Sequence, residues 1–148
     1  MRIILVFFLL IFFFSKNVFA ENNYFLMLKN NKVNVRYGPG FDYPIKYFYI
    51  KKNLPVKIID KKENFRRIID FKNNSGWIHT SQLSKIKSFI LLEDKTLFSK
   101  PTKYSKPILI ISKGRLLLVK KCKAKWCKVK TKKYIGWLEA KNVWGSIN

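Results

Sequence analysis

The side chains that carry acid–base, nucleophilic or metal chemistry are scarce in this chain of 148 residues. It holds eight Asp or Glu residues, two Cys and one His, against 31 Lys or Arg. The acids form no close pair, and no set of nucleophile and base can be assembled for catalysis. Gly38-Pro39-Gly40 is not a phosphate-binding loop, because it lacks the Lys-Ser/Thr end and a following helix. The sequence therefore predicts that the protein is not an enzyme and uses no metal or cofactor.

Cys122 and Cys127 stand at the two ends of a short segment, with four residues between them. Across a tight hairpin of an exported protein, two cysteines favour a disulfide. Closing so small a ring stabilises a fold by only about 2 kcal/mol, but it pins the hairpin. The alternatives are two free thiols or a metal site, and the metal site lacks ligands beyond a single His. Trp126 is expected to face opposite to Cys127 by strand alternation, which makes it a candidate for exposure.

A cluster of aromatic and charged residues between positions 36 and 47 is suited to binding. Its aromatic members are Tyr37, Phe41, Tyr43 and Tyr47. So many aromatic rings in one loop are difficult to bury together, which favours a partly exposed, ligand-binding face. Arg36 and Asp42 bracket the same loop. They either contact the charged ends of a peptide ligand or brace the loop.

Two Gly-Trp pairs mark an internal repeat. Gly76-Trp77-Ile78-His79 and Gly136-Trp137-Leu138-Glu139 stand about 60 residues apart, each behind a β-rich run and a polar turn. Trp77 and Trp137 either pack in a core or form the wall of a groove, since a flat apolar ring with one N–H suits a binding surface. His79 is expected at the surface, because its counterpart in the repeat is a glutamate.

The elements that must position these residues are short strands. Short β-rich runs recur between Gly, Pro, Asn and Lys turns, and no stretch after residue 20 has a helical period. In the first unit strands are expected at 24–28, 33–36, 46–50, 56–60, 65–70 and 76–79, with a 3₁₀ turn at 80–83. In the second unit they are expected at 89–92, 96–98, 108–112, 116–121, 126–131 and 134–138. Each unit has about 60 residues, a size at which small antiparallel sheets curl into barrels. The predicted fold class is all-β, with two tandem small β-barrels.

The first 20 residues have the layout of a secretory signal. Arg2 precedes the apolar run Ile3–Phe14, and Val18-Phe19-Ala20 precedes Glu21 in the pattern of a cleavage site. Twelve apolar residues rise about 18 Å as a helix, which is short of the roughly 30 Å hydrocarbon core. We therefore expect cleavage and no stable membrane span afterwards, with a retained N-terminal anchor as the alternative. The predicted domains are a signal peptide at 1–20 and β-domains at 21–85 and 86–148, exported to the periplasm or secreted.

The run Val33-Asn34-Val35-Arg36-Tyr37-Gly38-Pro39-Gly40 resembles the opening of bacterial SH3-like (SH3b) domains, in which such a strand enters a Gly-Pro loop. Asp42-Tyr43-Pro44-Ile45 and Gly76-Trp77-Ile78 continue the same pattern. In the second unit a different run, 96–101, replaces the opening. That unit retains Trp126, Gly136 and Trp137. The resemblance implies two tandem SH3-like β-barrels used for binding in the cell envelope, where members bind peptidoglycan peptides or glycan.

The predicted function is non-catalytic recognition of cell-wall peptidoglycan. The ligand-binding groove is predicted to consist of Arg36, Tyr37, Asp42, Tyr43, Trp77, Trp126 and Trp137. One alternative is the docking of a peptide of another envelope protein. The other is a charge-driven polyanion binder, since the net charge is +23, or +21 once Arg2 and Lys16 are removed with the signal. We expect a monomer with no specific nucleic-acid partner, and much of the lysine also fits the composition of an A/T-rich genome.

Overall fold

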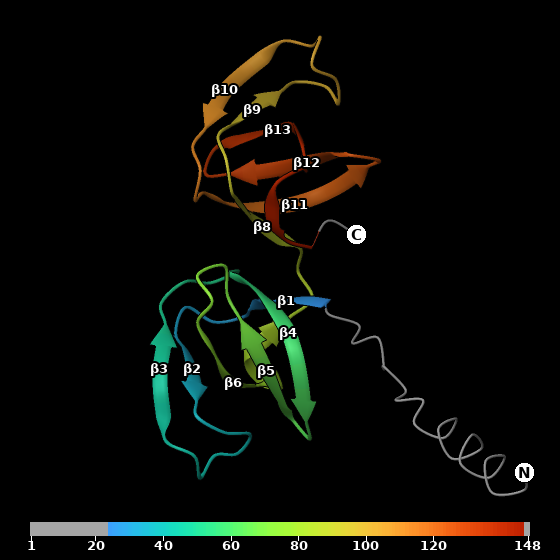
Figure 1. Ribbon diagram of the computed structural model, residues 1–148. Coiled ribbons are helices and arrows are strands. Elements are labelled where there is room, and N and C mark those ends of the chain that lie inside the picture. Colours follow the sequence, from blue (N-terminus) through green and yellow to red (C-terminus); the bar gives the residue numbers. More distant parts are fainter. Residues whose placement is uncertain (1–23, 147–148) are drawn as a thin grey trace, which may run out of the picture.

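The computed structural model describes residues 24–146, which form two antiparallel β-sheets, one after the other along the chain (Figure 1). Within that range the protein has no α-helix, so the all-β prediction is confirmed. No helix in the described range is long and apolar enough to cross a membrane. The predicted signal peptide at 1–20 and the first residues of the predicted first domain lie outside the described residues.

The first unit carries all the strands that the sequence predicts, with bounds that differ by at most two residues. They are β1 (Tyr24–Leu28), β2 (Val33–Arg36), β3 (Ile45–Tyr49), β4 (Pro55–Lys62), β5 (Phe65–Ile69) and β6 (Ser75–His79). The 3₁₀ helix η2 (Thr80–Gln82) and a short β7 (Leu83–Ser84) follow. The strands lie side by side in the order β3-β2-β6-β5-β4-β1-β7.

The second unit repeats this plan. Its strands are β8 (Ser88–Leu91), β9 (Lys95–Phe98), β10 (Pro107–Ile111), β11 (Leu116–Lys123), β12 (Trp126–Thr131), β13 (Tyr134–Glu139) and β14 (Val143–Gly145). Their spatial order, β10-β9-β13-β12-β11-β8-β14, matches that of the first sheet strand for strand. The internal repeat predicted from the two Gly-Trp pairs is therefore a structural repeat.

Neither sheet closes into a full barrel. In the described part of the chain the end strands β3 and β7 do not pair with each other, and neither do β10 and β14. The sheets curve instead through the long strands β4 and β11, each of which shifts register against its hairpin partner. Such a bulge sharpens the bend and twist of a strand, so one long strand can pair on both sides of a core without closure.

Each sheet wraps one apolar core. In the first unit the buried core includes Leu28, Val33, Val35, Val56, Ile58, Ile68 and Ile78. In the second it includes Phe89, Leu91, Leu97, Leu117, Val129 and Leu138. Because side chains alternate along a strand, burying Val33 and Val35 leaves Arg36 on the outer face of β2.

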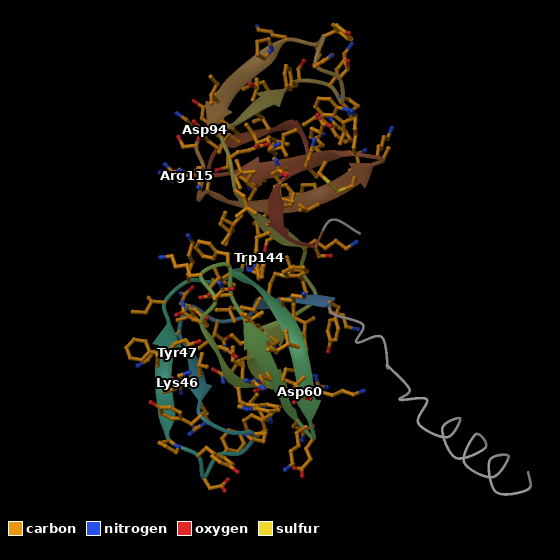
Figure 2. The ribbon with its side chains drawn as sticks, viewed as in Figure 1. Lys46, Tyr47, Asp60, Asp94, Arg115 and Trp144 are labelled. Carbon is orange, nitrogen blue, oxygen red and sulfur yellow. A yellow bond between two sulfur atoms is a disulfide. The ribbon has the colours of Figure 1, made fainter. Side chains whose placement is uncertain are left out.

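Strand β8 joins the two units, because all four of its residues are buried. Phe89 and Leu91 face the second core, while Ile90 belongs to the first core and the Ser88 hydroxyl donates to the carbonyl of Asn53 at 2.6 Å. Trp144 lies at the same junction (Figure 2) and donates from Nε1 to the carbonyl of Pro55. The two units therefore pack against each other through shared apolar side chains.

Candidate functional site

The loop between β2 and β3 is held by Arg36. Its Nη1 donates to the carbonyl oxygens of Tyr43 at 2.7 Å and Phe41 at 3.2 Å. The ring centroid of Phe41 lies 5.5 Å from the guanidinium carbon, within reach of a cation–π contact. Arg36 therefore braces the loop, and this fixes the orientation of the guanidinium on the outer face of the sheet.

Tyr43 completes the loop by packing on glycine. A Cβ at Gly38 would overlap the Tyr43 ring, so only glycine allows this close approach. Asp42 is exposed, lies beside Gly40 and forms no ion pair with Arg36. Tyr43 therefore shapes the loop through its ring and, by its carbonyl, through Arg36.

Beside this loop lies a surface hollow of about 240 Å³, which we call the first hollow. It is lined by Arg36, Tyr37, Lys46, Arg67, Ser75, Gly76 and Trp77. Lys46 donates from Nζ to the carbonyl of Ser75 at 3.0 Å, and its Nζ stands 5.6 Å from the ring centroid of Tyr37. The lining contains three cations and two aromatic rings but no carboxylate. Such a lining suits an anionic group that is attached to an apolar one.

Strand register explains why these residues meet. Trp77 on β6 is the direct partner of Arg36 on β2 and of Arg67 on β5, so the three form one row across the sheet. Asp60 is the partner of Arg67 on β4, but its carboxylate accepts from the backbone N–H of Lys61. In the described residues no ion pair neutralises the cations of the first hollow.

The structure brings three of the predicted groove residues together in the first hollow: Arg36, Tyr37 and Trp77. It adds Lys46 and Arg67, which the sequence did not single out. Lys46 follows the aromatic loop directly, so strand alternation there was the signal that could have identified it. Arg67 could be identified only from the register between β5 and β6, which pairs it with Trp77.

Trp126 and Trp137 lie in the second unit, away from the first hollow. Trp137 is only 7% exposed, so it is a core residue and not an open groove wall. Its direct partner on β9 is Phe98, where the first unit has Arg36 opposite Trp77. Trp126 is half-buried, with its ring 5.8 Å from Phe98 in an edge-on contact. In the second unit an aromatic residue thus stands opposite the tryptophan where the first unit has an arginine, and the Nζ of Lys121 lies 5.8 Å from the Trp137 ring centroid.

Three aromatic rings pack at the end of β6. His79 lies 5.0 Å from the Phe41 ring and 5.1 Å from the Phe65 ring, and its Nδ1 is 2.8 Å from the hydroxyl of Ser81. The side chain is therefore half-buried at the surface, packed against two aromatic rings, one of which, Phe41, is itself exposed.

Tyr47 was expected in the aromatic loop, but it lies on β3 in a hydrogen-bonded network. Its hydroxyl is 3.3 Å from that of Tyr49, which donates to the buried carboxylate of Asp70 at 3.0 Å. Burial raises the pKa of Tyr47 and, more strongly, that of Tyr49 above the ordinary value of 10.0. Asp70 also accepts from the backbone N–H groups of Lys72 and Asn74, so the network closes the β5–β6 turn.

The predicted disulfide is confirmed. Cys122 and Cys127 are direct partners on β11 and β12 and are joined through their sulfur atoms. Among the described residues no group of three or more His, Cys, Asp or Glu side chains lies close enough to hold a metal ion.

Comparison with known proteins identifies the repeat. A family model described as bacterial SH3 domain matches residues 29–85 and 94–145. Among curated proteins none matches the chain. The solved structure of NlpC2 from Trichomonas vaginalis aligns with a TM-score of 0.38 and 14% identity over 83% of this chain and 48% of that chain. NlpC1 from the same organism aligns with a TM-score of 0.38 and 13% identity over 83% and 46%. This chain thus spans about half the length of those two structures.

Proposed function

Because the chain belongs to the bacterial SH3 domain family, we propose that it is a non-catalytic binding protein of the cell envelope that recognises peptidoglycan. A bacterial SH3 domain by itself is a binding module. The observation that carries the proposal is the first hollow, whose lining combines three cations with two aromatic rings and no carboxylate. The disulfide is compatible with export, and it supports a periplasmic or secreted location.

The stem peptides of peptidoglycan offer the matching chemistry, since they carry free carboxylates next to small apolar side chains. An arginine fork binds a carboxylate through two parallel hydrogen bonds, and such charge-assisted bonds are the stronger ones. Arg36 is held in place by the loop carbonyls, so little side-chain freedom is lost when a ligand binds. Tyr37 and Trp77 offer flat apolar surface to the rest of the peptide.

The test is co-sedimentation of the protein with purified, protease-treated peptidoglycan sacculi, combined with titration of a soluble stem peptide. Arg67→Gln should weaken both interactions by at least about tenfold, because a hydrogen bond to a charged group is worth roughly 1.5–3 kcal/mol. The side chain is exposed, so the change should leave the melting temperature unaltered.

Arg66→Gln is the matched control, since it removes the same charge from the neighbouring position. Arg66 does not line the first hollow and donates to the carbonyls of Glu63 and Phe65. Equal loss of binding in both variants, or loss of all binding at high salt, would show that the interaction depends on net charge and not on the first hollow. No sedimentation of the unaltered protein would refute wall recognition.

A second candidate is the docking of an envelope-protein peptide, which the edge strand β3 favours. This strand stands at the end of the first sheet, with Ile45 and Phe48 about half exposed. An extended peptide can add to such an edge through backbone hydrogen bonds. Wall binding needs no protein partner, so retention on protease-treated sacculi distinguishes the two candidates.

A further inference from the structure

A second cationic hollow lies at the junction of the two units, away from the first hollow. This junction hollow measures about 500 Å³, and its lining includes Lys51, Lys113, Arg115 and Lys132. Three separate segments supply these cations: the β3–β4 loop, the β10–β11 turn and the β12–β13 turn. No acidic residue lines the hollow.

The four cations of the junction hollow are not neutralised by the protein. In the described part of the chain the ion pairs are Lys95 with Glu93 and Lys125 with Glu139. Asp94 is close to the β10–β11 turn, but it accepts from the backbone N–H of Lys113 rather than from a cationic side chain. The hollow therefore presents unpaired positive charge to a ligand.

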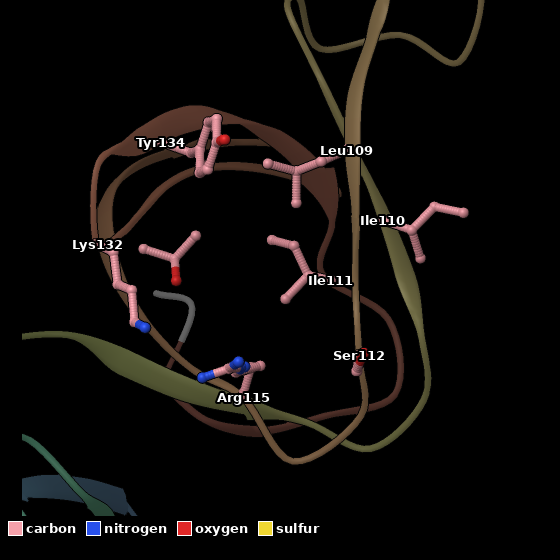
Figure 3. A pocket seen from close by; sticks show the side chains of 8 residues that line it. Leu109, Ile110, Ile111, Ser112, Arg115, Lys132 and Tyr134 are labelled. Carbon is pink, nitrogen blue, oxygen red and sulfur yellow. The ribbon is translucent and has the colours of Figure 1, made fainter.

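An apolar hollow of about 180 Å³ adjoins the junction hollow and shares part of its wall. Arg115, Thr131 and Lys132 line both. Figure 3 shows Leu109, Ile111 and Tyr134 on one side of the apolar hollow, with Arg115 and Lys132 on the other. Ile110 also lines the apolar hollow and is 71% exposed. Charged and apolar surfaces thus meet at one shared wall.

We propose that this shared wall binds an anionic amphiphile: a lipid whose phosphate lies among the four cations and whose first chain carbons contact Leu109, Ile111 and Tyr134. Cations from three segments suit a group with several anionic oxygens, such as a phosphate. The adjoining surface is aliphatic for the most part, which suits an acyl chain better than the stacked bases of a nucleic acid. The site lies in other elements than the first hollow, so it is independent of wall binding.

Lys132 can be replaced to test the proposal without destabilising the fold. Its backbone is left-handed, with φ of 43°, a conformation that asparagine adopts more readily than lysine. Lys132→Asn therefore removes one cation while favouring the same turn. Lys103→Asn is the matched control, because Lys103 is exposed and lines neither hollow.

The measurement is flotation of the chain from Glu21 onward with vesicles of phosphatidylcholine, alone or with phosphatidylglycerol. We expect binding only to the phosphatidylglycerol vesicles. Lys132→Asn should weaken it roughly fivefold, as one cation near an anionic surface does, and Lys103→Asn by less than about twofold. Arg67→Gln should leave it unchanged, which separates this site from the proposed wall-binding site.

The apolar part has its own pair of variants. Tyr134→Thr should also weaken vesicle binding, whereas Tyr24→Thr should not; the two tyrosines are 41% and 44% exposed. Soluble glycerol phosphate should compete only weakly with vesicle binding, because it lacks the acyl chain. Equal effects of Lys132→Asn and Lys103→Asn, competition by glycerol phosphate as strong as by the lipid, or no binding to phosphatidylglycerol vesicles would each overturn the proposal.

Discussion

At the scale of single residues, the two units differ in the strand partner of the repeated tryptophan. Trp77 has a cation on either side, Arg36 and Arg67, and its row stays accessible. Trp137 has Phe98 in place of the first cation, and its ring is buried. The same backbone plan thus yields a half-buried tryptophan between two arginines in one unit and a buried tryptophan between Phe98 and Lys128 in the other.

The tyrosine network of the first unit gives a prediction on pH. Tyr49 has a raised pKa in the folded state because of burial first and the neighbouring Tyr47 hydroxyl next. A raised folded-state pKa gives stability that is present below pH 10.0 and is lost as pH rises above it. The free energy of unfolding, measured by urea titration between pH 8 and 11, should fall at the alkaline end.

Tyr49→Phe is the informative variant, since it removes the titrating hydroxyl and keeps the ring. Its stability should fall less steeply above pH 10 than that of the unaltered chain, because the lysines titrate alike in both. Parallel curves would show that the network does not contribute to the alkaline loss.

At the scale of elements, hairpins position almost every residue discussed above. The two-residue turns of β4–β5, β11–β12 and β12–β13 each contain a left-handed residue, Glu63, Ala124 and Lys132. Left-handed turns of this kind match the twist of the flanking strands. In the second unit the β11–β12 hairpin is also tied by the disulfide, so the strand that carries Trp126 is held to its partner.

The disulfide should have a modest effect on stability. Reduction of Cys122–Cys127 should lower the free energy of unfolding by about 2 kcal/mol, since the closed ring is small. The comparison is urea unfolding of the same protein with and without a reductant. Unfolding of the second unit on reduction alone would contradict this estimate, because seven buried apolar residues besides Cys127 remain in its core.

At the scale of the whole molecule, the junction makes the two units one packed body. Ile90 comes from the second sheet but is buried in the core of the first, and Trp144 packs edge-on to Phe25 at 5.3 Å. The junction hollow exists only because the β3–β4 loop of one unit meets two turns of the other. The packing of the two units against each other therefore holds together the segments that form the proposed lipid site.

Ile90→Ala tests this coupling. The change should cost about 2–5 kcal/mol, as buried Ile→Ala substitutions do. Hydrogen exchange should speed up in both sheets, because β8 serves both cores. Val129→Ala, in the second core alone, is the comparison and should affect mainly the second sheet. Faster exchange confined to one sheet in Ile90→Ala would mean that the units unfold independently.

Much of the fold followed from local patterns. Alternating apolar residues such as Val33 and Val35 predicted β2, the two Gly-Trp pairs predicted the repeat, and the spacing of Cys122 and Cys127 predicted the disulfide. These features depend on residues close together in the chain, where strand alternation and turn chemistry act directly. Whether each barrel closes could not be read from these patterns, because closure depends on pairing between the two end strands.

The candidate site could be predicted only in part. The sequence determined which residues are exposed cations and aromatics, so Arg36, Tyr37 and Trp77 were identified. Only the tertiary structure placed Arg67 beside Trp77, placed Trp137 beside Phe98 and brought Lys51 and Arg115 to one hollow at the junction. The reason is physical: a local pattern decides which face a side chain takes, whereas strand order and register between distant segments decide its neighbours.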